Sequence, residues 1–232
     1  MQDQAVVSVE WLGHAAFVLS FGQLRVVTDP FPPTMGYPAI HQPAEVVTVS
    51  HEHFDHNHVQ SVTGAPRVLR GLSGNDWQAI DEEISGVRIR SFPTYHDDQL
   101  GRARGKNAVF AFEFGGLRVV HLGDLGHPLG AAPHTATADQ IGPADVLLVP
   151  VGGFYTIDAR LAHEVANALR ARVVIPMHYR TPALAGWPIE SEQPFLRLRP
   201  ASRELSGPVS LSADQLPPAP ETWVFAYRGS RS

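Results

Sequence analysis

The 232-residue sequence contains no cysteine. This absence excludes disulfide bonds, thiolate metal ligands and a cysteine nucleophile. Lysine is almost absent as well, because Lys106 is the only lysine among 18 basic residues. With 23 acidic residues the formal net charge is −5, so the composition offers no basic surface that would indicate nucleic-acid binding.

Long apolar stretches are also missing. No run approaches the roughly 18 apolar residues that a membrane-spanning helix needs, and residues 1–11 lack the charged and apolar segments of a signal peptide. We therefore expect a cytoplasmic enzyme or binding protein. Residues 1–232 are interpreted as a single domain, with residues 181–232 its least clearly assigned part. The sequence leaves open whether the chain forms a homo-oligomer.

The apolar pattern predicts two sheets with helices outside them. Strands are expected in the following segments: 5–28 (as a meander), 46–49, 66–69, 86–96, 107–114, 116–124, 145–151, 172–178 and 222–227. A short helix is expected over 74–83. An amphipathic helix is expected over 158–170, with Asp158 as its N-cap. Residues 181–222 contain eight prolines and no long periodic run.

A dense group of potential metal ligands follows the predicted strand 46–49. His51, His53, Asp55 and His56 lie within six positions. Imidazole nitrogen and carboxylate oxygen are donors that zinc and related divalent ions bind. Folding alone does not explain this density. The alternatives are a coincidental spacing of surface or core histidines and a degenerate metal site without catalysis.

Three further donors, His96, Asp124 and His178, each end a predicted strand. In sheets covered by helices, ligands collect outside the carboxyl ends of the strands, so these side chains are expected to meet the histidine cluster. Seven donors exceed the three protein ligands that a catalytic zinc usually has. They suit two metals that share a carboxylate and stand about 3.5 to 4 Å apart.

The order H-x-H-x-D-H, a lone histidine, an aspartate and a final histidine resembles the metallo-β-lactamase superfamily over about residues 8–180. The segments WLGHAAF, HLGDLGH, DVLLVPVGG and IPMHY resemble its small metal-dependent hydrolases, including ascorbate-phosphate lactonase-like proteins. WLGHA and H-x-H-x-D-H also resemble N-acyl-phosphatidylethanolamine phospholipase D. The resemblance implies the α+β class and a four-layer αββα sandwich with a dinuclear site at one edge.

The resemblance also implies how the donors are divided. The first metal would be held by His51, His53 and His96, the second by Asp55, His56 and His178, and Asp124 would bridge them. The ions would be two divalent metals, with Zn²⁺ favoured and Mn²⁺ or Fe²⁺ as alternatives. A metal-bound hydroxide would be the nucleophile, and Asp55 would orient it. Asn57 and His58 replace the glycine-rich turn of glyoxalase II-like enzymes, which argues against thiolester hydrolysis.

Other residues have two interpretations each. His14 is a catalytic candidate beside Asp55, or a structural turn histidine. Asp29 is a hydrogen-bond partner for a ligand histidine, or a turn residue before Pro30. Arg102, Arg104 and Lys106, in the loop 97–106, are an anion clamp for the substrate or simply solvated basic residues. Tyr155 and Thr156 are candidates to line the pocket, and His127 is a candidate to lie behind a metal ligand.

The sequence thus predicts a dinuclear metal-dependent hydrolase. Its expected target is an ester-like bond, in a lactone or a phosphodiester, of a small anionic substrate. An iron-dependent oxygenase or redox protein on the same fold is the alternative enzyme. A metal-bearing binding protein without turnover is the alternative outside enzymes. The expected partner is a small anionic substrate. Neither a nucleic-acid partner nor a membrane span is expected, and a homo-oligomer is left open.

Overall fold

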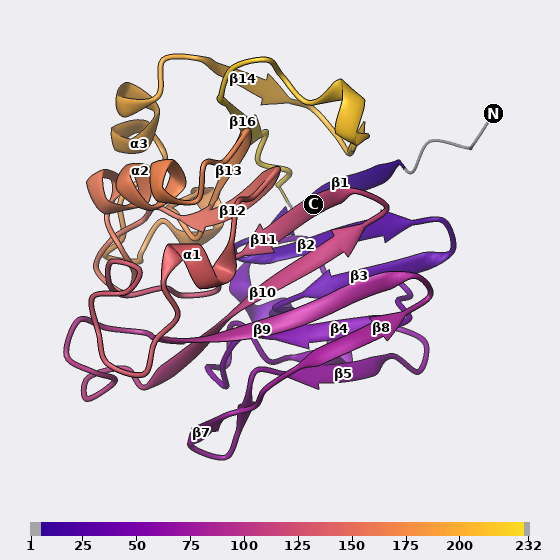
Figure 1. Ribbon diagram of the computed structural model, residues 1–232, viewed down its shortest axis with the longest axis horizontal. Helices are drawn as coiled ribbons and strands as arrows, with labels where there is room; N and C mark the ends of the chain where they lie inside the picture. Colours follow the sequence, from indigo (N-terminus) through magenta and orange to yellow (C-terminus); the bar gives the residue numbers. More distant parts are fainter. Residues whose placement is uncertain (1–5, 230–232) are drawn as a thin grey trace.

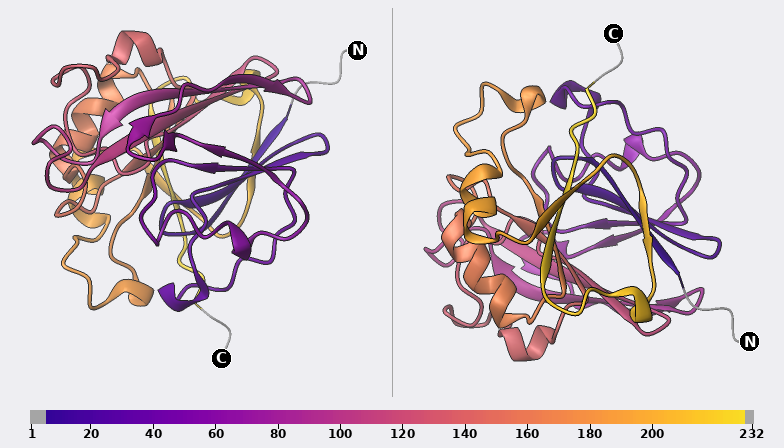
Figure 2. Two further views of the ribbon diagram at one scale, coloured as in Figure 1. Left: turned by 90° about the horizontal axis from the view of Figure 1, so that it is seen from below. Right: turned by 90° about the horizontal axis from the view of Figure 1, so that it is seen from above.

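The computed structural model describes residues 6–229, in which two large β-sheets pack face to face and the short strands β6 Leu72–Ser73 and β7 Asp76–Trp77 form a small two-stranded sheet (Figure 1). The six-stranded sheet has the order β15-β1-β2-β3-β4-β5. Its strands are β1 Val7–Gly13, β2 Ala16–Phe21, β3 Leu24–Thr28, β4 Val46–Val49, β5 Arg67–Arg70 and β15 Val209–Leu211. Figure 2 shows this sheet and the larger one as separate layers.

The eight-stranded sheet has the order β14-β16-β13-β12-β11-β10-β9-β8. Its strands are β8 Asp81–Ile84, β9 Val87–Tyr95, β10 Lys106–Phe114, β11 Leu117–His121, β12 Val146–Pro150, β13 Val173–Met177, β14 Ser202–Leu205 and β16 Glu221–Phe225. The predicted hairpin between residues 107 and 124 is confirmed as the antiparallel pair β10–β11.

Strand direction brings the ends of several strands to one edge of the sandwich. Strands β3, β4 and β5 are parallel neighbours, as are β11, β12 and β13. Strands β9 and β11 are both antiparallel to β10, so these two also run in the same direction. The residues that follow β4, β9, β11 and β13 are therefore positioned to converge.

Aromatic side chains of β10 fill the space between the sheets. Phe110, Phe112 and Phe114 lie two residues apart and therefore on one face of the strand, and all three are buried. The ring of Phe114 contacts that of Phe21 in β2, with centroids 5.9 Å apart. This contact joins the inner faces of the two sheets.

The α-helices all come from connections within the eight-stranded sheet, as far as residues 6–229 are concerned. They are α1 Ala138–Ile141, α2 Ala159–Ala168 and α3 Gln193–Leu198. The predicted amphipathic helix is confirmed as α2, and the carboxylate of its N-cap Asp158 accepts a 2.8 Å bond from the backbone N–H of Leu161. The connections β3–β4 and β4–β5 carry only the short 3₁₀ turns η1 Pro33–Met35 and η2 Val59–Ser61.

The predicted helix over residues 74–83 is wrong. This segment holds part of the small hairpin of β6 Leu72–Ser73 and β7 Asp76–Trp77, and then most of β8. Strand β8 pairs with the long strand β9, from Asp81 opposite Arg90 to Ile84 opposite Val87. Pairing with this neighbour decides the conformation, because a short polar segment has little preference of its own.

The chain after β13 completes both sheets. Its turns are η3 Pro182–Leu184 and η4 Ala213–Gln215. Strands β14 and β16 extend the larger sheet, whereas β15 pairs with β1 in the smaller one. The predicted α+β sandwich is confirmed. No helix within residues 6–229 is long and apolar enough to cross a membrane.

Candidate metal centre

The carboxylate of Asp124, three residues after β11, is the meeting point of the strand ends. It is 2% exposed. Its Oδ2 lies 3.1 Å from Nε2 of His96, 3.2 Å from Nε2 of His178 and 3.3 Å from Nε2 of His56. Nε2 of His51 lies 3.8 Å away. One buried oxygen therefore faces four imidazoles that come from three strand ends.

The candidate ligand atoms form three groups, each with all its atoms within 4.8 Å of one another. The first cluster consists of His51, His53 and His96; the second cluster consists of His14, Asp55, His56 and His178. The third group contains Asp29 with one histidine of each cluster, His51 and His56. The first and second clusters divide the donors as the sequence interpretation does, with His14 added to the second. The role of the seven predicted residues as ligands stays a prediction.

The donors fit a divalent cation electrostatically. Nε2 of His51, Nε2 of His56 and Oδ1 of Asp124 are buried and form no hydrogen bond with residues 6–229. Burial, followed by the neighbouring His56, lowers the pKa of His51, so its imidazole stays neutral. Burial alone would raise the pKa of Asp124, but the surrounding histidines, led by His178, hold it well below its usual range. Burial alone would lower the pKa of His56, but Asp124 and Asp55 act in the opposite direction and raise it well above its ordinary value. Imidazole nitrogens around an ionised carboxylate are donors that zinc and related ions take.

Asp29, directly after β3, orients a histidine of each cluster. Its Oδ2 lies 2.9 Å from Nδ1 of His56. The Ser50 hydroxyl donates to the same oxygen at 2.5 Å and lies 2.9 Å from Nδ1 of His51. With both Nδ1 atoms engaged, Nε2 of each ring is directed to the centre. The hydrogen-bonding interpretation of Asp29 describes its contacts, whereas the sequence reasoning missed Ser50, the residue that precedes the cluster.

His14 lies against the second cluster. It is fully buried, and its Nε2 is 3.0 Å from Oδ2 of Asp55. Burial, followed by the neighbouring charge of His178, lowers the pKa of His14 to about 4. Burial would raise the pKa of Asp55, but His56 and the bond from His14 reverse this, so the pKa lies below its usual value. A neutral imidazole therefore donates to an ionised carboxylate.

Two further side chains that the ligand pattern did not identify fix the neighbouring backbone. Asn107 Oδ1 accepts a 3.0 Å bond from the backbone N–H of Asp124, and its Nδ2 donates to Thr94 Oγ1 at 2.8 Å. His127, interpreted from the sequence as a residue behind a ligand, accepts a 3.0 Å bond from the N–H of Tyr95, next to His96. Asn107 starts an apolar strand, which gives no local signal of this role.

A cavity of about 520 Å³ opens beside the centre. His53, Asp55, His96, Asp124 and His178 form part of its wall. Among the other predicted pocket residues, Arg104 and Tyr155 line it. Arg102 and Thr156 do not, and Lys106 lies elsewhere, with Nζ 2.6 Å from Oδ1 of Asp76.

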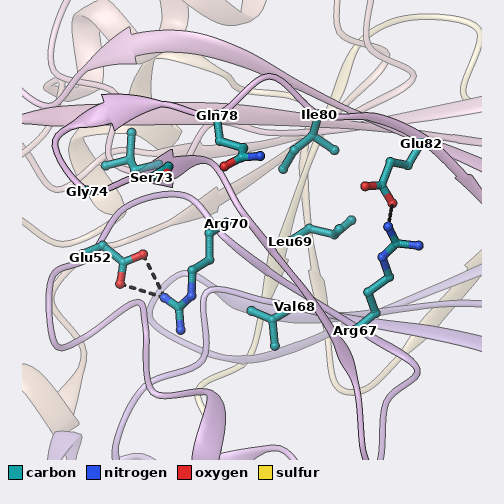
Figure 3. A pocket seen from close by; sticks show the side chains of 11 residues that line it. Glu52, Arg67, Val68, Leu69, Arg70, Ser73, Gly74, Gln78, Ile80 and Glu82 are labelled. Carbon is teal, nitrogen blue, oxygen red and sulfur yellow. Dashed lines mark hydrogen bonds and ion pairs between the residues drawn. The ribbon is translucent and has the colours of Figure 1, made fainter.

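A second cavity, of about 530 Å³, has Glu52 in its wall (Figure 3). Glu52 borders both cavities. Its two carboxylate oxygens lie 2.8 and 2.7 Å from Nη1 of Arg70, and Arg67 pairs with Glu82 across the second cavity. The charged side chains of the second cavity therefore form ion pairs with one another. In contrast, buried donor atoms beside the first cavity have no hydrogen-bond partner within residues 6–229.

Comparisons with known proteins agree with this centre. Residues 8–178 match the family model of the β-lactamase superfamily domain. A UPF0173 metal-dependent hydrolase of Pyrococcus abyssi is 28% identical over 82% of this chain and 89% of the relative. Another, of Thermococcus kodakarensis, is 31% identical over 83% and 92%. A candidate Zn-dependent hydrolase of the metallo-β-lactamase superfamily from Thermotoga maritima has a TM-score of 0.74 and 38% identity, over 94% of this chain and 98% of that one. The chain therefore belongs to the β-lactamase superfamily, within its UPF0173 family of metal-dependent hydrolases.

Proposed function

We propose that the protein is a dinuclear metal-dependent hydrolase that cleaves an ester-like bond, a lactone or a phosphodiester, in a small anionic substrate. One observation carries the dinuclear assignment. Oδ2 of Asp124 lies within 3.1 to 3.3 Å of His96 in the first cluster and of His56 and His178 in the second. A carboxylate between two sets of imidazoles is placed to bridge two cations.

The donor residues divide the work of holding these ions. His51, His53 and His96 would bind one ion, and Asp55, His56 and His178 would bind the other. Zinc suits this nitrogen-rich set, and manganese or iron would be accepted by the same donors. Bound ions of this kind lower the pKa of a coordinated water toward neutrality and so supply the hydrolytic nucleophile.

Asp55 and His14 complete the centre on one side. Asp55 stays ionised and faces the cavity, so its carboxylate is available both to a cation and to the proton of a water molecule. His14 is fully buried and bonded to Asp55 Oδ2, and it does not line the cavity. We therefore assign His14 as a positioning residue for Asp55 rather than as a group that touches the substrate.

The proposal is tested by metal analysis coupled to a hydrolysis screen. Purified protein is expected to contain about two divalent ions per chain and to hydrolyse members of a panel of lactones and phosphodiesters. His51→Ala should reduce both metal content and turnover. His163→Ala provides the matched control, because this histidine lies on α2, contacts Asn167 and belongs to neither cluster.

Three outcomes would contradict the proposal. If His51→Ala left the rate of hydrolysis unchanged, the metal centre would take no part in the reaction. Bound iron together with oxygen uptake on substrate addition would indicate an oxygenase. Tight small-molecule binding without any product across the panel would indicate a binding protein.

A further inference from the structure

We propose that the cavity beside the metal centre selects substrates that carry an anionic group next to a flat apolar body. In this assignment the guanidinium of Arg104 binds the anion, and the rings of Trp187 and Tyr155 contact the apolar part. The assignment rests on the proposed function in one respect: the cavity is taken as the substrate site.

The loop that carries Arg104 is built on a buried carboxylate. Asp97, 3% exposed, accepts four backbone N–H bonds across this loop. The bond from Arg104 itself is 2.7 Å long. These four bonds therefore hold the backbone of Arg104 at the edge of the cavity.

The Arg104 side chain has no carboxylate partner. Among residues 6–229 it forms no ion pair, whereas Glu52, the other charged residue of the cavity outside the donor set, is bound by Arg70. The guanidinium instead lies 5.6 Å from the ring centroid of Tyr155 and 5.9 Å from that of Phe154. Ring faces hold a guanidinium without neutralising it, so its N–H donors stay available to an anion.

The neighbouring basic residues provide the contrast. Lys106 is paired with Asp76 and lies over the Trp77 ring, 4.3 Å from its centroid. Arg102 is exposed, and its Nε donates to the backbone carbonyl of Gln99. Neither lines the cavity. Of the three residues in the predicted anion clamp, Arg104 alone is placed to bind a ligand.

Three aromatic side chains line the cavity beside the donor atoms, those of Phe54, Tyr155 and Trp187. Trp187 lies 5.7 Å from His14, 5.8 Å from Tyr155 and 6.5 Å from Phe54, measured between ring centroids. Phe54 is 60% exposed and Phe154 is 61% exposed, which a fold does not require of such large apolar side chains. Aromatic rings beside the Arg104 guanidinium fit a ligand that carries an anion on a flat apolar body.

The test uses ligands that need no turnover. Binding of phenylacetate, 3-phenylpropionate and 4-phenylbutyrate to the metal-loaded protein is measured by calorimetry, together with binding of the three corresponding carboxamides. Arg104→Gln should weaken binding of the preferred carboxylate about tenfold or more, because a charge-assisted hydrogen bond is lost. The same variant should leave binding of its carboxamide within about twofold.

Two variants separate the parts of the site. Arg102→Gln removes the same charge from the same loop but outside the cavity, and it should leave both ligands unaffected. Trp187→Leu should weaken the carboxylate and the carboxamide by a similar factor. Circular dichroism and the melting temperature establish that each variant is folded.

The proposal is overturned if Arg104→Gln and Arg102→Gln have equal effects on carboxylate binding. It is also overturned if wild-type protein binds none of the six ligands, or binds each acid and its amide equally. Selective carboxylate binding through Arg104 in a protein that hydrolyses nothing would support this assignment and contradict the proposed function. The two failures are therefore distinguishable.

Discussion

Oδ2 of Asp29 lies 2.9 Å from Nδ1 of His56, and the opposite nitrogen of the same ring faces Asp124 at 3.3 Å. The same carboxylate oxygen accepts the Ser50 hydroxyl, which contacts His51. Asp29 has a φ of 39°, in the left-handed region, which a residue other than glycine adopts at a cost. A single carboxylate in a strained turn thus directs one histidine of each cluster to the centre.

Asp29→Asn should weaken metal binding about 10- to 100-fold, as is typical when a carboxylate behind a ligand histidine is lost. The amide provides only one accepting oxygen for the partners that now share the carboxylate. Competition with a chromophoric zinc chelator measures the affinity. Ser50→Ala is the matched control: it removes the hydroxyl between Asp29 and His51 but keeps the contact of Asp29 with His56, so its loss should be smaller. Equal affinity of wild type and Asp29→Asn would contradict this role.

Gly126 lies where a side chain would collide with the backbone of a predicted ligand. A Cβ at this position would overlap the carbonyl group of His96 and the backbone nitrogen of Asp97. Gly126→Ala should therefore lower the free energy of unfolding by about 1 to 3 kcal/mol and also weaken metal binding, because His96 must shift. Urea denaturation of metal-free protein measures the first effect.

Gly186→Ala is the control for this prediction, because a Cβ there would meet open space. Its free energy of unfolding should stay close to that of the wild type. If the two alanine variants were equally stable and bound metal equally well, the close approach at Gly126 would have no energetic consequence.

The strand ends and the candidate donors that follow them were recognisable in the sequence because both signals are local. An apolar run followed within two residues by a histidine marks a strand end and a candidate donor at once, as at His51 and His178. That the Arg104 side chain forms no ion pair within residues 6–229 was not predictable, since it depends on the course of the loop that Asp97 organises. The same holds for Asn107, whose bond to the backbone of Asp124 joins two strands.

The misassigned segment 74–83 has a related cause. Its sequence has no strong periodicity, and its conformation is decided by the nine-residue strand β9 beside it. The contact of His14 with Asp55 is likewise made across 41 positions of the chain, through the packing of the first turn on the histidine cluster. The interpretation of residues 1–232 as one domain stays a prediction.

His121 predicts a pH dependence of stability in the metal-free protein. Its Nε2 donates to the carbonyl of Ala15 at 2.8 Å, and its Nδ1 accepts the N–H of Gly123 at 3.1 Å, so the folded state uses the neutral ring. Burial lowers its pKa below the ordinary 6.5, and this outweighs the opposing charge of Asp29. Below pH 6.5 the unfolded state therefore takes up a proton that the folded state does not.

The contribution of His121 to stability is accordingly full above pH 6.5 and is lost as the pH falls toward its folded-state pKa. Between pH 7.5 and pH 5.5, the free energy of unfolding of His121→Gln should fall less than that of the wild type. The difference approaches about 1.4 kcal/mol per pH unit at most. Urea denaturation in the presence of EDTA measures it. Parallel pH profiles of the two proteins would show that His121 titrates alike in both states.

His53 and His178 predict that the two ions can be removed separately. They belong to different clusters, and His53 is the exposed member of the first, whereas His178 is buried in the second beside Asp124. His53→Ala and His178→Ala should each reduce the bound metal from about two ions to about one per chain. The double variant should lose nearly all of it, as measured by mass spectrometry of the metal content after dialysis. If His53→Ala alone emptied both sites, or if the double variant kept one ion, the two clusters would not act as separate sites joined by Asp124.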